Sequence, residues 1–170
     1  MRLRLYEAVS AGYTLLEVML WCSVLGICAG VLVNVMQWHD HALVRNEIDT
    51  LYYVLIAHTF RACAEDCVCD IVMDERGWTT NHETHALVED VTFGVMPGCK
   101  GPPSDPTSYI SYPITFSHQR IRFYPDGKIQ PGTVYFTDKS LRVSYAISCP
   151  VGKISYIRRY RYTAGTWVTL

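Results

Sequence analysis

The stretch Gly12-Tyr13-Thr14-Leu15-Leu16-Glu17-Val18-Met19-Leu20 places one glutamate near the start of an apolar run that carries no other charge until Asp40. At the centre of a bilayer, an unpaired ionisable side chain costs about 2.5 to 3.5 kcal/mol. Glu17 therefore needs a cationic partner. The nearest candidate is a new α-amino group, which cleavage between Gly12 and Tyr13 would create about one helical turn away. In that arrangement, the Glu17 carboxylate of one subunit neutralises the amino terminus of a neighbouring subunit.

The apolar run over residues 13–36 has the length and composition of a membrane-spanning helix. At about 1.5 Å per residue it would be roughly 36 Å long, which crosses a bilayer with some tilt. Gly26 and Gly30 form a G-x-x-x-G pair inside it, a spacing that lets two helices approach closely. The same glycines could instead only soften the helix, because each costs a helix about 1 kcal/mol. A secretory signal peptide is disfavoured, since the apolar run follows the candidate cleavage site and no A-x-A-like site ends it.

A helical pattern continues beyond the apolar run, but on one face only. Apolar residues recur there at the spacing of an amphipathic helix. They are Val44, Ile48, Leu51, Leu55 and Ala62, and the polar residues expected on the other faces are Arg45, Asn46, Glu47, Asp49 and Thr50. His58 falls on the apolar stripe, where a hydrogen-bonded core histidine is favoured over a ligand. The sequence therefore predicts one helix from Tyr13 to near Ala64.

From Ile114 the chain has the composition and alternation of β-strands, and two short apolar stretches before it could also be strands. Candidate strands lie at residues 71–73, 91–95, 121–123, 133–137 and 141–149, and another is expected to begin at Lys153. Pro125-Asp126-Gly127 lies in the connection between the third and fourth of these. Residues 141–149 alternate apolar and polar side chains, which is typical of a strand with one buried face. The predicted fold class is therefore α+β: a long amino-terminal helix followed by an antiparallel sheet, with the amphipathic half of the helix covering one sheet face.

Length and charge limit the classes of protein that fit the chain. After a membrane helix, its 170 residues leave enough for one ordinary domain. A formal net charge of −1 argues against a globally basic nucleic-acid binder. The sequence contains no nucleophile-elbow, zinc-peptidase or phosphate-loop motif, and its acids and histidines form no nucleophile and base spacing. We therefore expect a protein that is not an enzyme and that holds no cofactor.

Seven cysteines divide between the apolar run, which contains Cys22 and Cys28, and the rest of the chain. An exported domain occupies a disulfide-permissive compartment, so disulfides are expected among the others. The candidates are Cys67, Cys69, Cys99 and Cys149, with a bridge from either of the first two to either of the last two. The alternative is a tetrahedral metal site, whose ligands would be Cys63, Cys67 and Cys69 with His58, or with His82 and His85. The spacing is not that of a repeated zinc-knuckle pair, so no metal site is predicted.

Basic and aromatic residues interleave near the carboxyl end. The basic residues are Lys153, Arg158, Arg159 and Arg161, and the aromatic ones are Tyr156, Tyr160 and Tyr162. Such a cluster can hold single-stranded nucleic acid by phosphate contact and base stacking, so the four cations are candidate DNA contacts. In a strand, Arg159 and Arg161 would share one face, while Arg158 joins the tyrosines. The alternative, which we favour, is that these charges protect an edge strand from aggregation.

The stretch around Gly12 resembles the prepilin signal of type IV pilins and type II secretion pseudopilins. That signal has a short basic leader, here with Arg2 and Arg4, then glycine, an aromatic residue, Thr-Leu-Leu-Glu and an apolar helix. The resemblance implies cleavage after Gly12 by a prepilin peptidase and methylation of the new amino group of Tyr13. Tyr13 stands where phenylalanine is commoner in these families.

A second resemblance lies in the β region. The minor-pilin family that contains the H pseudopilin of type II secretion and FimT of type IV pili has a similar carboxy-terminal pattern. Its counterparts here are Arg122-Phe123-Tyr124-Pro125-Asp126-Gly127, Gly132-Thr133-Val134-Tyr135-Phe136 and Gly152-Lys153-Ile154. Some relatives in the FimT branch bind DNA through carboxy-terminal arginines after the glycine. In this chain Lys153 follows that glycine, and Ser155 stands where one arginine would be expected.

The resemblances imply a leader peptide at residues 1–12, a transmembrane and assembly helix at residues 13–36, and a periplasmic pilin-like domain at residues 37–170. The expected function is that of a minor pilin or pseudopilin, a structural subunit near the tip of a type II secretion pseudopilus or a type IV pilus. Its partners would be prepilin peptidase, the inner membrane and other pilins, contacted through the amino-terminal helix and Glu17. Two alternatives stay open: a DNA-binding minor pilin for natural transformation, and a membrane-anchored metal or redox module.

The leader predicts a defined amino terminus for the mature protein. Because Gly12 precedes the apolar run, the membrane-inserted protein should begin at methylated Tyr13. Mass spectrometry of the amino-terminal peptide measures this directly. Recovery of Met1 on the functional, membrane-inserted form would contradict the prediction.

Overall fold

The computed structural model describes residues 14–101, 107–150 and 156–170. The chain divides into two compact units, Met1–Trp38 and His39–Leu170. Gly12, Tyr13 and Lys153 lie outside the described residues, and so does the strand start expected at Lys153.

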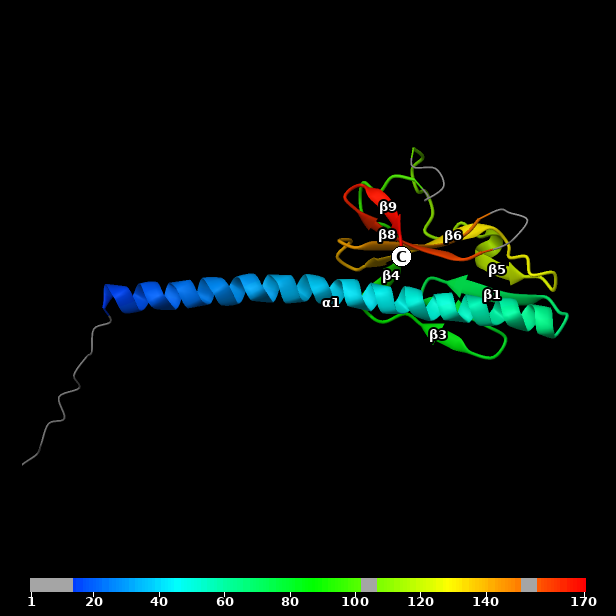
Figure 1. The fold of residues 1–170 in the computed structure, drawn as a ribbon, viewed down its shortest axis with the longest axis horizontal. Coiled ribbons are helices and arrows are strands. Elements are labelled where there is room, and N and C mark those ends of the chain that lie inside the picture. The colour runs from blue at the N-terminus through cyan, green and yellow to red at the C-terminus, as the bar shows by residue number, and fades with distance from the viewer. Residues whose placement is uncertain (1–13, 102–106, 151–155) are drawn as a thin grey trace, which may run out of the picture. The chain divides into compact units, whose positions relative to one another are not determined.

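The helix α1 (Leu15–Ala64) has 50 residues, which confirms the prediction of one helix that ends near Ala64 (Figure 1). It begins after Thr14, whose Oγ1 accepts a hydrogen bond from the backbone N–H of Glu17 at 3.2 Å. An 18-residue window of α1 has a mean hydropathy of 2.2 and none of it is buried, so by length and composition the helix can cross a membrane. The chain leaves the helix through a turn in which Asp66 has a φ of 48°.

The predicted apolar stripe of α1 is buried in the His39–Leu170 unit. All five of its side chains, at Val44, Ile48, Leu51, Leu55 and Ala62, are 0 % exposed. They join one hydrophobic cluster with side chains such as Ile121 and Ile147. Burying a side chain of the size of leucine or isoleucine stabilises a fold by about 1.5 to 3 kcal/mol, so this stripe contributes a large share of the stability. The amphipathic interpretation of this half of the helix is confirmed.

The strands form two antiparallel sheets (Figure 1). The four-stranded sheet has the order β3-β2-β1-β5 and consists of β1 (Cys69–Asp74), β2 (Gly77–Thr79), β3 (Thr84–Ala86) and β5 (Arg120–Phe123). The five-stranded sheet has the order β4-β6-β7-β8-β9 and consists of β4 (Val91–Phe93), β6 (Gly132–Asp138), β7 (Ser144–Cys149), β8 (Arg158–Thr163) and β9 (Thr166–Thr169). A short 3₁₀ turn, η1 (Ser117–Gln119), precedes β5. The α+β class is therefore confirmed.

The prediction of one sheet is wrong, because consecutive strands enter different sheets. β5 pairs with β1, whereas β6 pairs with β4 and β7. Between β5 and β6, the N–H of Gly127 donates to the carbonyl of Tyr124 at 3.0 Å, and Gly127 has a φ of 77° that glycine adopts without strain. Phe123 and Ile129 then form an isolated bridge. After this turn the chain passes into the five-stranded sheet.

The prediction of a strand with a single buried face at residues 141–149 is also wrong. In β7, Ser144 and Ala146 are buried as fully as Tyr145 and Ile147 on the other face. A loop covers the side of Ser144, whose Oγ accepts the backbone N–H of Met96 at 2.7 Å. The side chains on that face are small, so a loop can lie close above them. Leu141 is exposed in the preceding turn with a φ of 54° and is not part of the strand.

The buried stripe should dominate the stability of the His39–Leu170 unit. Replacing Leu51 by alanine removes a fully buried side chain and should lower the free energy of unfolding by about 2 to 5 kcal/mol. Thermal unfolding of the full chain in mild detergent, followed by circular dichroism, measures the change. Tyr53→Ala is the matched control on the same helix, because Tyr53 is 66 % exposed and its loss should change stability by about 0.5 kcal/mol or less. Equal effects of the two substitutions would contradict the packing described here.

Candidate functional site

The first candidate site is the apolar surface of α1 in the Met1–Trp38 unit. Every side chain from residue 14 to residue 33 is exposed, and Leu15 and Trp38 are each 80 % exposed. An exposed apolar surface of this extent marks contact with a membrane or with another protein. A Cβ added to Gly26 or Gly30 would meet no atom within 4 Å, so both glycines leave room for a close neighbour on the helix surface.

Glu17 has a local role that the sequence analysis missed. Its backbone N–H is capped by the Thr14 hydroxyl, and Thr14-Leu15-Leu16-Glu17 has the T-x-x-E pattern of a capping box. A carboxylate in the first turn of a helix is also favoured by the helix dipole. The sequence signal was available in the spacing of Thr14 and Glu17. Glu17 can therefore favour the start of α1 in addition to any pairing with another subunit.

The second candidate site is the arginine cluster of β8. Arg159 forms an ion pair with Asp49 of α1, and its guanidinium lies 4.2 Å from the ring centroid of Tyr52. The Nη2 atom of Arg161 lies 3.4 Å from Nε2 of His41, also on α1. As predicted, the two arginines share one face of the strand. That face meets the helix, and both side chains are half-buried.

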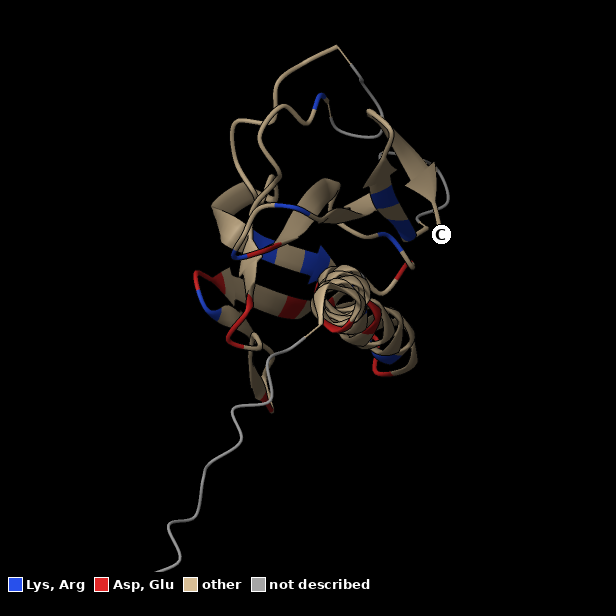
Figure 2. Cartoon of the chain, turned by 90° about the vertical axis from the view of Figure 1, so that its left-hand side faces the viewer, with Lys and Arg blue, Asp and Glu red and all other residues tan. Residues whose placement is uncertain are grey.

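Arg158 points elsewhere and is exposed, with its guanidinium 4.3 Å from the ring centroid of Tyr156. Both basic and acidic positions occur along the described strands and loops of the His39–Leu170 unit (Figure 2). β8 pairs with β7 on one side and β9 on the other, so the interpretation of Arg158, Arg159 and Arg161 as protection of an edge strand is wrong. Of the described candidate DNA contacts, Arg158 alone is exposed, whereas Arg159 and Arg161 contact α1.

The His41 ring connects Arg161 to the core. Its Nδ1 lies 3.4 Å from the hydroxyl of Tyr145. Burial lowers the pKa of His41, and the charge of Arg161 lowers it further. A guanidinium can only donate, so Nε2 of the neutral ring accepts from Arg161 and Nδ1 donates to Tyr145. This arrangement holds a neutral histidine between the helix and β8.

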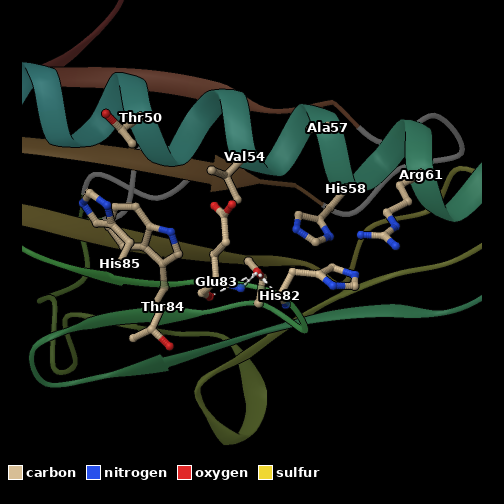
Figure 3. Close-up of a pocket in the computed structure, with 11 residues that line it drawn as sticks. Thr50, Val54, Ala57, His58, Arg61, His82, Glu83, Thr84 and His85 are labelled. Carbon is tan, nitrogen blue, oxygen red and sulfur yellow. Dashed lines mark hydrogen bonds between the residues drawn. The ribbon is translucent and has the colours of Figure 1, made fainter.

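The third candidate site is a cavity of about 450 Å³ between α1 and the hairpin formed by β2 and β3. Figure 3 shows His58 and Arg61 projecting from the helix toward His82 and Glu83 of the hairpin. His85 stands at the other end of the cavity, where its Nε2 lies 2.9 Å from the Glu47 carboxylate. The cavity thus combines three imidazoles with one guanidinium and a carboxylate.

The position of Glu47 differs from the one predicted from the sequence. It was expected on a solvent-facing side, but it is only 4 % exposed and pairs with His85. The His85 ring stacks on Trp78 with centroids 4.1 Å apart, which fixes the imidazole against the carboxylate. A buried carboxylate requires such a partner, because an unpaired one would carry a large desolvation cost.

His58 is buried, as the sequence predicted, but its Nδ1 has no hydrogen-bond partner among the described residues. Its ring lies against Phe123, with centroids 5.9 Å apart. Burial lowers the pKa of His58, and the charges of Arg61 and His82 lower it further, so the ring is neutral at pH 7. In the neutral form with the proton on Nε2, the unpartnered Nδ1 is an acceptor and not a stranded N–H.

Cys22 and Cys28 lie in the Met1–Trp38 unit, the other five cysteines lie in different parts of the His39–Leu170 unit, and all seven are unbridged in the structure. The predicted bridge from Cys67 or Cys69 to Cys99 or Cys149 is therefore not present. Cys69 begins β1 of the four-stranded sheet, whereas Cys149 lies in β7 opposite Gly132. Burial raises the pKa of Cys99, and it raises the pKa of Cys149 to about 12. The Sγ atoms of Cys67 and Cys69 lie 3.8 Å apart.

The alternative metal ligands are not assembled either. The described residues include His58, His82, His85 and all the cysteines, yet they contain no group of three or more metal-ligating side chains in suitable positions.

The chain matches no protein-family model, no curated protein and no solved structure.

The contact of Arg159 with α1 should contribute to the free energy of unfolding. Arg159→Gln removes both the ion pair with Asp49 and the stacking on Tyr52, and it should lower the free energy of unfolding by about 1 to 2 kcal/mol. Thermal denaturation of the full chain in detergent measures this effect. The matched control is Arg158→Gln, one position away on the exposed face, which should leave stability unchanged. If both variants were as stable as the parent protein, the two arginines would be equivalent surface charges.

Proposed function

We propose that this protein is a minor pilin or pseudopilin, a non-enzymatic subunit that enters a type II secretion pseudopilus or a type IV pilus near its tip. The observation that carries the proposal is the change of character along α1. The first part of the helix exposes apolar side chains all round, whereas the second part buries one stripe in the folded unit. Such a helix suits a subunit that first resides in a bilayer and then packs against other helices.

The sequence at the start of the chain leads us to include cleavage and methylation in this proposal. Prepilin peptidase would cleave after Gly12, and the new amino group of Tyr13 would be methylated. The first half of α1 would then anchor the subunit in the inner membrane, with the His39–Leu170 unit in the periplasm. During assembly, the Glu17 carboxylate would pair with the amino terminus of a neighbouring subunit. In a water-poor filament core, leaving either charge unpaired would be strongly unfavourable.

The geometry gives less support to the two alternative functions. For a DNA-binding pilin, the side chains of Arg159 and Arg161 would have to reach phosphates, but both contact α1. For a metal module, three or more ligands should converge, and the described residues bring no such group together. The structural subunit needs neither arrangement.

Substitution of Glu17 tests the proposal. Glu17→Leu removes a charge from the membrane segment, so the variant should insert at least as well as the parent protein. Its incorporation into filaments should fall sharply, because the partner ammonium is left without its counter-ion. Immunoblotting of the membrane fraction and of sheared or purified filaments measures both quantities.

Glu17→Gln separates charge pairing from helix capping. A glutamine can complete a capping box with Thr14, but it carries no charge. Under the proposal, Glu17→Gln should assemble as poorly as Glu17→Leu. Thr14→Ala, which removes the capping hydroxyl and keeps the carboxylate, should assemble far better than either. Normal assembly of Glu17→Gln would show that capping, and not a charge pair, is what Glu17 supplies.

A further inference from the structure

Cys67 and Cys69 stand on either side of Val68, where the chain passes from α1 into β1. Their Sγ atoms are 3.8 Å apart. Val68 is 50 % exposed, while Cys67 is half-buried and Cys69 is buried. Burial therefore places both thiols toward the interior and Val68 toward solvent, at the bend between α1 and the first residue of β1.

The other described thiols are placed differently. Cys99 and Cys149 are buried, and burial raises the pKa of each thiol, which makes both poor nucleophiles. Cys63 is exposed, and its Sγ lies 3.9 Å from the position that a Cβ on Gly127 would occupy, so it faces the connection between β5 and β6. Cys22 and Cys28 are exposed on the first part of α1. Among the described thiols, Cys67 and Cys69 are thus the pair that the fold brings together.

We propose that Cys67 and Cys69 form a reversible intramolecular disulfide by thiol–disulfide exchange with an external disulfide. The thiolate of Cys67 attacks one sulfur of that disulfide, forms a mixed disulfide and releases the first thiol. Cys69 loses its proton and attacks Sγ of Cys67, which releases the second thiol. In total, two protein thiols become one disulfide, and the external disulfide is reduced to two thiols.

The order of these steps follows from exposure. Cys67 is half-buried and its thiol donates to the Glu65 carboxylate at 3.7 Å, whereas Cys69 is almost fully buried at the start of β1. Burial raises the pKa of Cys69, and its hydrogen bond with Cys67 raises it further. Cys69 therefore suits the second, intramolecular step, where proximity to the mixed disulfide compensates for weak ionisation. The exchange should become faster as the pH rises, because the thiolate is the attacking species.

The resulting bridge should be easy to reduce. A bridge across one intervening residue has little freedom to reach the preferred disulfide geometry, and deviations from that geometry store strain. Cys69 is held in place by its pairing with Phe123, so any adjustment falls on the bend that contains Cys67. Strained disulfides have the more oxidising potentials that suit reversible chemistry. The proposal needs an oxidising compartment but does not depend on assembly into a filament.

Peptide mapping of the full chain in detergent micelles tests the proposal. The folded protein is incubated with oxidised glutathione, remaining thiols are alkylated, and the chain is cut after glutamate. Cleavage after Glu65 separates Cys63 from the peptide that contains Cys67 and Cys69. That peptide should be lighter by two hydrogen atoms and carry no alkyl label, while Cys63 is labelled. Reduced glutathione should restore both labels.

Three further measurements make the result specific. Cys67→Ser should abolish the bridge and leave Cys69 labelled, whereas Cys63→Ser should leave the bridge unchanged. Oxidation in urea should weaken the preference for this pair over Cys63, because the fold no longer holds the two Sγ atoms 3.8 Å apart. Alkylation of both thiols after oxidation of the folded chain, stable glutathione adducts on both, or a bridge from either thiol to Cys63 would overturn the proposal.

Discussion

The buried stripe of α1 gives the two sheets a common surface to pack against, and the arrangement of the His39–Leu170 unit follows from that contact. Strands alternate, so each sheet has an apolar face that must be covered. Ile71 and Ile121 from the four-stranded sheet and Val134 and Ile147 from the five-stranded sheet join one cluster with the stripe. Apolar burial is non-directional, however, and does not by itself determine how the helix is rotated about its axis.

Ion pairs and hydrogen bonds at the edges of the buried stripe determine how α1 is rotated about its axis. Glu47 and Asp49 are two positions apart, so their side chains leave the helix about 200° apart around its axis. Glu47 reaches His85 on β3, and Asp49 reaches Arg159 on β8. Each sheet therefore has its own polar contact with α1. Rotating the helix to improve one pair would break the other.

The features that were predicted correctly from the sequence depend only on residues within a single helix or strand. The spacing of Val44, Ile48 and Leu51 determines which face of a helix is apolar, whatever that face later meets. The errors concern partners that lie far away in the chain. Glu47 was assigned to the surface as a charged residue, because nothing nearby indicates a partner 38 positions later. The entry of β5 and β6 into different sheets depends on pairing with β1 and β7, which alternation along a strand does not encode.

The arginines of β8 are a second case in which the sequence did not indicate partners that lie far away in the chain. Alternation correctly predicted that Arg159 and Arg161 share a face, but it could not indicate that this face meets Asp49 and Tyr52. The second half of α1 carries acids that meet bases from the sheets, and Asp40, 3.4 Å from Arg142, adds to the pairs already described. The near-zero net charge is therefore partly the result of complementary charges inside the fold. Cations used in this way hold the helix to the sheets, and their side chains are correspondingly less available to a polyanion.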